Sequence, residues 1–483
     1  MRSLIISLFI VIFLPLAASA DITLYGSDSV KLLLSGEVTG RVEYWNFFEP
    51  TGSFNNDYFY EFTRTKLGLK FETAYLDAFL QAQNVNMFGL PDDAIAPAPQ
   101  GVLGGGAIYF VHDRQKNPTS TYLRHALLKL KIAPFTLTAG RLTFFDGEEV
   151  LYKDDPKMNW LKKVRMSERL IGPFGWSSFQ RSFDGAVATY DDTAINVTGA
   201  AFHPTQGGFE KNGGITIRDI DVAYVALTLK KGVVPNSDAR LFYIFYEDDR
   251  GLQKADNQPA SSLLDEGDVR INTLGLHVAS TFRLADKSEM DLILWGAIQR
   301  GKWGQLDQKS WAWNAELGYQ FLDVPLKPWV RAGYFVSSGD DDPNDDEHGT
   351  FTQLLPTVRK QSNTPAYYNY MNIEDLFAML ILKPSPKATI KLDVNFVGLN
   401  DSADRWYFGS GATSKTVFGF TGRPSQGEDY IGTMAGGHVF YNFNEYLSLY
   451  FYYSHMWGGD VVKKTFPEGS QGDFSFLELT FKF

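Results

Sequence analysis

The 483-residue sequence contains no cysteine. This absence excludes disulfides, a lipid-bearing N-terminal cysteine, covalent haem attachment and thiolate metal sites. Basic excess is also missing, because the formal charge is −11, and nucleic acid is therefore excluded as a partner. After residue 20, no stretch approaches the run of about 18 apolar residues that a membrane-spanning helix needs. A helical membrane protein is not expected.

Catalytic motifs are missing as well. The seven histidines are scattered along the chain, and no motif links any of them to a nucleophile. Membrane-embedded hydrolases need a Ser/His or Asp/His constellation near the rim of the protein. The sequence therefore predicts neither an enzyme nor a resident cofactor.

The N-terminus has the features of an export signal. A basic start at Arg2 precedes an apolar run over residues 4–16, and Ala18, Ser19 and Ala20 are the small residues that a signal peptidase reads. We expect residues 1–20 to be a signal peptide and residues 21–483 to form the mature domain. The chain is thus expected to leave the cytoplasm.

Aromatic residues are abundant although the mean hydropathy is low. They make up 15% of the chain, and the mean hydropathy is only −0.19. This combination is typical of a membrane β-barrel, in which lipid-facing and lumen-facing residues average out.

The recurring local pattern has a period of two, which predicts strands. In residues 390–396, Ile390, Leu392, Val394 and Phe396 alternate with polar residues. Residues 311–321 repeat the pattern with tryptophan, leucine, tyrosine and phenylalanine on one face. The final segment, residues 473–483, does the same and ends on Phe483, like the terminal strand that outer-membrane insertion machinery recognises.

About eighteen such segments follow one another, each near the length of a tilted membrane strand. They start near residues 31, 57, 75, 120, 135, 176, 193, 218, 237, 268, 287, 308, 327, 372, 387, 428, 446 and 473. Short connections alternate with longer ones, and the 300–307 connection fits this alternation least. The predicted fold is all-β: a single transmembrane antiparallel β-barrel with short periplasmic turns and long external loops. Such a barrel has a lumen too wide for side chains alone to fill, which favours a pore.

Several motifs resemble the alginate-export family of outer-membrane proteins. They occur in order along the mature chain at residues 64–71 (RTKLGLKF), 140–141 (GR), 181–185 (RSFDG), 338–340 (SGD), 349–351 (GTF), 446–449 (YLSL) and 454–455 (SH). The resemblance implies an eighteen-stranded barrel in the bacterial outer membrane. It also implies export of an acidic polysaccharide through a lumen rich in arginine and lysine, although many family members lie outside alginate-producing contexts.

Alternation suggests which charged residues line the pore. The candidates are Arg41, Arg64, Lys66, Arg141, Arg181, Asp184, Glu316, Arg331, Lys391 and Asp393. Further inward charges are expected at Lys70, Glu37, Glu43, Asp291 and Glu478. For each of them, a salt bridge that stiffens the wall is an alternative to a solute contact. If Arg64, Lys66, Arg141 and Arg181 cluster, they form a basic constriction that binds carboxylates or phosphates.

The parity of a residue, its odd or even position along a strand, decides which face it takes, and it leaves some of these assignments open. Arg141, Arg331 and Asp291 share their parity with apolar neighbours. Arg181 and Asp184 have opposite parity, so both face the lumen only if a bulge intervenes. Positive and negative candidates are nearly balanced. A dedicated polyanion conduit should instead show strong basic excess.

Three external connections carry further hypotheses. The acidic run over residues 340–347 offers a calcium candidate in Asp340, Asp342, Asp345 and Asp346, but its spacing departs from an EF-hand loop and favours a solvated loop. The proline- and glycine-rich residues 97–106 are expected to fold inward and narrow the pore. The basic 144–175 connection is expected to hold a short helix or lumen-lining segment, or to touch lipopolysaccharide phosphates.

The functional prediction is a porin for passive diffusion or export of hydrophilic solutes, including anionic ones. The alternatives are a secretion conduit for an anionic exopolysaccharide such as alginate, working with periplasmic partners, and the barrel of a porin–cytochrome electron conduit. The expected environment is outer-membrane lipid and lipopolysaccharide.

Overall fold

The computed structural model describes residues 21–483 except 97–99, 102–103, 209, 211, 255–264, 358, 362–363, 409–411, 416–419 and 421. The predicted signal peptide therefore lies outside the described residues. None of the described helices is long and apolar enough to cross a membrane.

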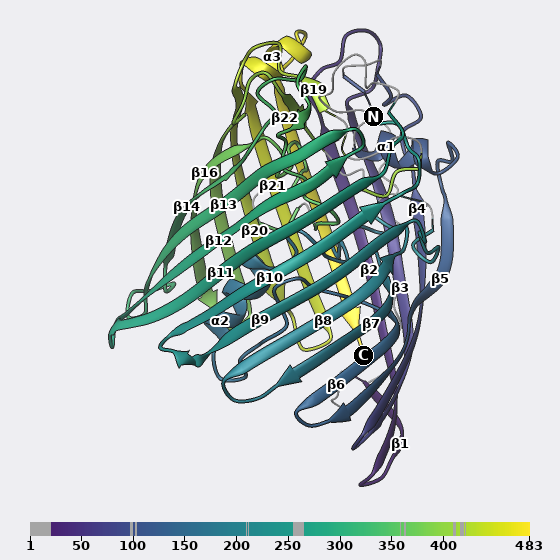
Figure 1. Cartoon of the computed structure of the whole chain (residues 1–483), viewed down its shortest axis with the longest axis vertical. Helices are drawn as coiled ribbons and strands as arrows, with labels where there is room; N and C mark the ends of the chain where they lie inside the picture. Colours follow the sequence, from purple (N-terminus) through teal and green to yellow (C-terminus); the bar gives the residue numbers. More distant parts are fainter. Residues whose placement is uncertain are drawn as a thin grey trace.

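Eighteen antiparallel strands form one closed wall (Figure 1). In chain order they are β2 (Val30–Asn46), β3 (Asp57–Thr73), β4 (Leu76–Phe88), β5 (Thr119–Ile132), β6 (Phe135–Leu142), β7 (Phe183–Asp191), β8 (Ile195–Pro204), β9 (Ile220–Val234), β10 (Ser237–Asp248), β11 (Val269–Ala285), β12 (Ser288–Trp303), β13 (Leu306–Phe321), β14 (Trp329–Ser337), β16 (Glu374–Ser385), β17 (Ala388–Gly398), β20 (Tyr430–Asn442), β21 (Leu447–Gly458) and β22 (Gln471–Lys482). The predicted all-β barrel is confirmed.

The barrel closes where the last strand pairs with the first. β22 runs antiparallel to β2 from the pair Glu37↔Lys482 to the pair Asn46↔Asp473. Below that seam, the short strand β1 (Ile22–Gly26) pairs with residues 31–34 of β2. Closure satisfies the backbone N–H and C=O groups that an open sheet edge would expose to hydrocarbon.

Period-two alternation decides which side chains face outward. In β13, Trp311, Trp313 and Leu317 are exposed on the outer face, whereas Asn314 and Glu316 are buried on the inner face. Tryptophan and leucine suit the lipid, while amide and carboxylate groups need partners that only the lumen supplies. The same rule holds around most of the wall.

Short turns lie at one end of the barrel and long loops at the other (Figure 1). All but one of the strands begin within two residues of the predicted start. The exception is β7, which begins at Phe183, because residues 176–182 lie inside the lumen and not in the wall. The 300–307 connection is a tight turn in which Gly304 adopts a φ of +61°, so one external connection is as short as a periplasmic turn.

Two external loops fold into the lumen. Loop L3 (residues 143–182) contains helix α2 (Pro156–Trp160) and the π-helix η1 (Leu161–Met166). Loop L7 (residues 338–373) contains the two-residue strand β15 (Glu347–His348). The two loops meet at a parallel bridge between Ile171 and Leu355, where both residues are fully buried. The hypothesis that the 144–175 connection holds a short helix and lines the lumen therefore agrees with the structure.

The remaining elements cover the external rim. They are α1 (Gly104–Val111), α3 (Asp460–Thr465), and the small sheet of β18 (Arg405–Tyr407) and β19 (Gly422–Pro424). Gly104 and Gly105 of α1 lie so close to Trp45, Tyr58 and Tyr60 that an added Cβ would collide with these inward rings. The second external loop thus packs inward, as its glycines suggested.

Candidate functional site in the barrel lumen

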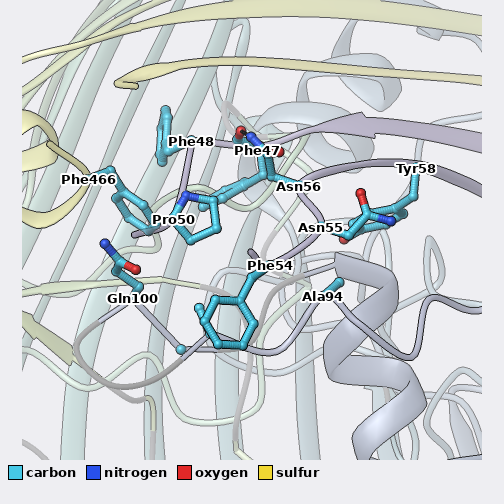
Figure 2. Close-up of a pocket in the computed structure, with 12 residues that line it drawn as sticks. Phe47, Phe48, Pro50, Phe54, Asn55, Asn56, Tyr58, Ala94, Gln100 and Phe466 are labelled. Carbon is cyan, nitrogen blue, oxygen red and sulfur yellow. Dashed lines mark hydrogen bonds between the residues drawn. The ribbon is translucent and has the colours of Figure 1, made fainter. Parts of the chain in front are cut away.

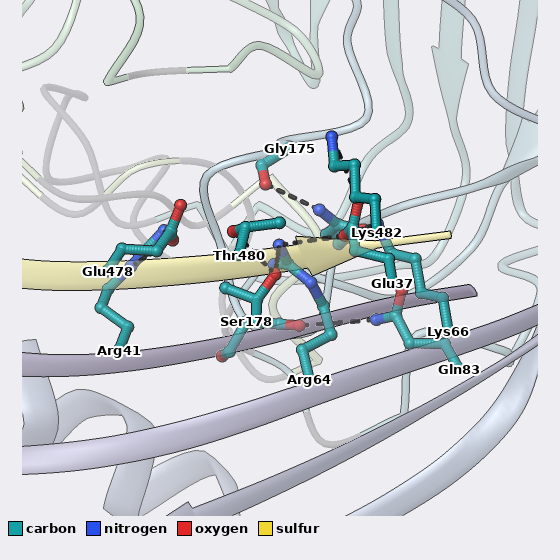
Figure 3. A network of polar contacts seen from close by, with 12 residues as sticks. Glu37, Arg41, Arg64, Lys66, Gln83, Gly175, Ser178, Glu478, Thr480 and Lys482 are labelled. Atoms are coloured by element: carbon teal, nitrogen blue, oxygen red, sulfur yellow. Dashed lines mark hydrogen bonds and ion pairs between the residues drawn. The ribbon is translucent and has the colours of Figure 1, made fainter. Parts of the chain in front are cut away.

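One side of the lumen carries a row of basic side chains on neighbouring strands (Figure 3). Arg41 of β2 binds Glu478 of β22 at 2.6 Å. On β3, Lys66 binds Glu37 at 2.9 Å, and Arg64 lies 3.8 Å from the same carboxylate. The structure therefore places Arg41, Arg64 and Lys66 inside the lumen, where alternation predicted them.

Arg124 of β5 belongs to the same row but was not predicted. The β4–β5 pairing shifts register between Gln81 and Ala82, and Arg124 is the residue that the shift leaves without a partner. It is buried and donates to the Arg181 carbonyl and, at 2.8 Å, to the Ser182 hydroxyl. A bulge of this kind reverses the parity of the strand, which single-sequence alternation cannot show.

The basic row holds the backbone of loop L3. Arg41 donates to the Trp176 carbonyl at 3.0 Å, and Arg64 donates to the Ser177 carbonyl at 2.9 Å. Among the described residues, Nε of Arg64 has no hydrogen-bond partner. Beside their carboxylate partners, the two guanidinium groups thus also donate to neutral carbonyl oxygens, and one donor of Arg64 remains unsatisfied.

A cation–π contact joins loops L3 and L7 to this wall. The Trp176 ring contacts the guanidinium of Arg41, at 4.2 Å from the ring centroid, and that of Arg359, at 3.8 Å. Arg359 belongs to L7 and is itself buried. Buried contacts of this kind contribute on the order of 2 kcal/mol when they are desolvated.

The opposite wall is acidic, and basic residues of loop L3 cover it. Lys162 binds Asp238 of β10 at 2.8 Å, and Arg165 binds Glu316 of β13 at 2.8 Å. Both pairs are almost fully buried. Because α2 and η1 lie between this wall and the centre, the acidic wall does not face the open lumen.

Arg331 and Glu316 point inward, as the prediction requires, but this helical segment seals them. Arg331 binds Glu316 at 2.8 Å and also pairs with Asp291 of β12. Trp329, an apolar neighbour that shares the parity of Arg331, packs against Trp160 of α2 with ring centroids 4.6 Å apart. Where a loop covers the inner face of the wall, that face also carries apolar side chains, so sharing parity with apolar residues did not place Arg331 against lipid.

Lys391 and Asp393 of β17 also face inward. Lys391 lies 3.2 Å from Asp393, and Nε2 of His438 lies 3.0 Å from the same carboxylate. His438 in turn contacts the Tyr450 hydroxyl at 2.8 Å through Nδ1. The cluster pairs its own charges, which agrees with the wall-stiffening alternative.

Arg141 and Asp184 do not line the lumen. They form a cross-strand pair at 2.7 Å on the face opposite Phe183, which points inward and is fully buried. The physical reason is plain alternation, because Arg141 shares its parity with the outward-facing Phe135 and Leu137, and β6 keeps a regular register with both of its neighbours. Loop L4 (residues 205–219) covers the pair, because Arg141 donates to the Gly214 carbonyl.

Arg181 lies inside the barrel but on loop L3, not on a strand. It is buried and donates to the carbonyls of Gly172, at 3.1 Å, and Leu355, at 2.9 Å, and so ties L3 to L7. Of the four residues expected to form a basic constriction, only Arg64 and Lys66 contact a common partner. Arg41 and Arg124 complete the row in place of Arg141 and Arg181.

The carboxylates of the acidic run in loop L7 do not lie around a common centre. Asp340 is buried and accepts a hydrogen bond from the Gly349 N–H at 3.3 Å. Asp342 and Asp345 accept backbone N–H groups of their own turn. Among the described residues, no three acidic or histidine side chains are grouped to hold a metal ion. The geometry therefore gives the calcium candidate Asp340, Asp342, Asp345 and Asp346 no common centre.

Asp340 instead lies near Asp404 of loop L8 (residues 399–429). Asp404 accepts hydrogen bonds from the Asp340 N–H at 3.0 Å and from the Thr350 hydroxyl at 2.6 Å. Burial raises the pKa of Asp340 to about 7, with His348 opposing the rise and Asp404 adding to it. Burial likewise raises the pKa of Asp404 to about 6, and its hydrogen-bond donors offset part of the rise.

We expect contact between loops L7 and L8 to weaken as the pH rises. A carboxyl with a higher pKa in the folded chain binds more protons when folded, so stability is greatest below about pH 4 and is lost up to about pH 7. A spin label at exposed N344C, unique in a cysteine-free chain, should be more mobile at pH 8 than at pH 5. D340N combined with D404N should flatten this dependence. An unchanged transition in the double variant would contradict the assignment.

Above the lumen, the external loops enclose a small apolar pocket (Figure 2). Phe47, Phe54 and Phe466 line it together with Gln100. The Gln100 side chain accepts from the Thr51 N–H at 2.9 Å and donates to the Thr465 carbonyl at 3.0 Å. This amide joins three external loops, so the pocket belongs to the packing of the rim.

Comparisons with known proteins agree with this geometry. The profile of a family described as alginate export matches residues 115–475. No curated protein matches the sequence significantly. Among solved structures, Pseudomonas aeruginosa OccK9 (OpdG) is 12% identical with a TM-score of 0.58, covering 93% of this chain and 98% of its own.

Two further structures show the same fold. Acinetobacter baumannii OccAB1 is 10% identical with a TM-score of 0.56, and covers 93% of this chain and 96% of its own. Pseudomonas aeruginosa OpdK with vanillate is 10% identical with a TM-score of 0.53, and covers 93% and 98%.

Proposed function

The chain belongs to the alginate-export family, and from this premise we propose that it is an outer-membrane channel whose basic row selects small anionic solutes. The observation that carries the proposal is the contact between arginines and loop carbonyls on one wall. Arg41 and Arg64, on adjacent strands, donate to adjacent carbonyls of residues 176–177. Family and fold are those of channels, not of enzymes.

A carboxylate competes well for these donors. Hydrogen bonds between a guanidinium and an ionised oxygen are roughly twice as strong as those to a neutral carbonyl. An anionic solute that reaches Arg64 therefore replaces the Ser177 carbonyl with a stronger partner and satisfies the orphan Nε. We infer that solute binding favours release of residues 176–182 from the wall.

The two loops favour small solutes over a polymer in this conformation. L3 and L7 are joined at Ile171 and Leu355 and tied by Arg181. A polysaccharide strand would require both loops to leave the lumen together, whereas a small anion needs local displacement only. The secretion conduit for an acidic polysaccharide stays the alternative, because the family name supports it and the same arginines would serve it.

Reversal potentials in planar bilayers test the proposal. In a potassium chloride gradient, we expect the channel to pass chloride in preference to potassium, because the four cations of the basic row outnumber the carboxylates of Glu37, Glu43 and Glu478 beside them. Vanillate, which is present in one structural neighbour, should reduce the chloride current at lower concentration than its neutral alcohol analogue does. Cation selectivity would contradict the proposal. Block by long oligouronates but not by vanillate would favour the polysaccharide conduit.

A further inference from the structure

The outer wall of the barrel contains a hollow in its apolar band. It has a volume of about 540 Å³ and lies over strands β10–β13. Gly296 of β12 and Ala315 of β13 face outward and form its floor, while Leu276, Ile298 and Trp313 stand around it. An added Cβ at Gly296 would meet only ordinary contacts, the nearest at 3.6 Å, so the floor opens toward the membrane.

Strand register places a basic row just above this hollow. Gly296 is opposite Leu276 and Trp313, and the next outward row toward the loops is Leu274, Ile298 and Trp311. The row beyond that consists of Asn272, Arg300 and Lys309. Four residues of an antiparallel strand span about 14 Å, so the charged groups lie about that far from the floor.

The position of the charges within these rows decides what they can bind. Arg300 and Lys309 occupy the row that borders the apolar band, and on β11–β13 this row contains no acidic residue. Glu347 of β15 is the acidic residue that contacts it, at Lys309. The other carboxylates lie one row farther out, where Glu247 binds Arg270 at 2.5 Å and Asp307 pairs with Lys302. Positive charge thus meets the apolar band directly.

The two basic residues of this row are available to an anion. Within the described part of the chain, Arg300 has no carboxylate partner and donates to the Gln299 carbonyl at 2.7 Å. Lys309 pairs with Glu347, but both side chains are 46% exposed. Exposed ion pairs contribute only about 0–1 kcal/mol, so a phosphate can replace this partner.

We propose that this surface binds a phosphorylated glycolipid of the outer leaflet, the lipid A part of lipopolysaccharide. Its phosphate would bind Arg300 and Lys309, and one acyl chain would fill the hollow over Gly296. An apolar hollow within the membrane band has to be filled by lipid or protein, and the adjacent positive row complements a phosphorylated headgroup. The 144–175 connection, the earlier candidate for such a contact, lies in the lumen and cannot reach it.

Native mass spectrometry of the barrel in mild detergent tests the proposal with purified lipid A. We expect one retained lipid A per barrel, and at least about tenfold weaker binding for R300Q combined with K309Q and for G296L. G296L fills the floor without a close contact, so it is expected to fold. Retention of the compact, heat-modifiable form on gels checks folding for every variant.

Matched controls separate this site from general lipid binding. G40L adds the same side chain on the outer face of β2, where no atom lies within 4 Å of an added Cβ. K463Q with K464Q removes two exposed charges from α3. Both controls should bind lipid A like the unchanged protein. The proposal fails if all variants retain lipid A equally, if phosphatidylglycerol binds as tightly, or if G296L abolishes oligomers of the chain and not lipid adducts.

Discussion

Replacing Arg165 with glutamate should raise the single-channel conductance several-fold. Arg165 is buried against Glu316 and lies over the Phe377 ring at 4.9 Å. Reversal of its charge places two carboxylates in contact inside the lumen, and loss of a buried pair costs about 3–5 kcal/mol. A shift of that size moves a two-state equilibrium more than about a hundredfold, enough to release η1 from the acidic wall. Conductance in planar bilayers measures the result.

Lys163 supplies the matched control for this prediction. It lies two residues away on the same π-helix, but its side chain is exposed. K163E carries the same change of charge and should leave the conductance near that of the unchanged protein. Equal conductance in R165E and the unchanged protein would mean that L3 does not limit the current. A rise in both variants would point to net charge and not to the buried pair.

Removing the charges of Arg64 and Arg124 together should abolish most of the anion preference. Both guanidinium groups are buried on the basic wall, and only Arg64 lies within 4.0 Å of a carboxylate among the described residues. In a partly screened lumen, the interaction energy between each charge and a passing ion is about 1–4 kcal/mol. Loss of both charges should therefore bring the reversal potential close to zero. The effect should grow at low salt, because the Debye length is about 30 Å at 0.01 M.

Arg141 and Lys463 provide a charge-matched comparison. The first lies on the outer face of the wall and the second on the exposed helix α3. R141Q with K463Q removes the same total charge and should change the selectivity little. If this pair shifts the reversal potential as much as R64Q with R124Q, the selectivity arises from the overall charge of the protein, and the basic row is not the filter.

The lumen also explains why positive and negative candidates seemed balanced. Acidic residues cluster on β10, β12 and β13, and the lysines and arginines of L3 neutralise them. In the basic row on β2, β3 and β5, Glu37, Glu43 and Glu478 pair with part of the positive charge, and Arg64 and Arg124 also donate to backbone carbonyls of L3. A count of charged residues along the sequence combines the charges of both walls. Only their separation in space leaves one wall with a net positive potential that a solute can meet.

Prediction from sequence succeeded where alternation was followed, and it failed where a strand is irregular or where the alternation was set aside. Arg41, Arg64 and Lys391 sit on regular strands, and each faces inward as its neighbours indicated. Arg124 sits at an irregularity in β5 and was missed, whereas Arg141 faces outward with the apolar residues whose parity it shares, as regular alternation requires. One extra residue in a strand reverses the face of every residue after it, and no single-sequence pattern records that insertion.

Taken alone, the sequence determined the class of fold, the number of strands and their starts, because burial on one face imposes a two-residue period that can be read locally. Phe183 is the exception: residues 176–182 read as the beginning of a strand but lie across the lumen. The path of L3 and L7, the split into a basic and an acidic wall, and the hollow above Gly296 were decided by tertiary structure. They depend on which distant segments meet, such as Ile171 with Leu355 and Arg165 with Glu316, and such meetings follow from closure of the barrel and leave no local period in the chain.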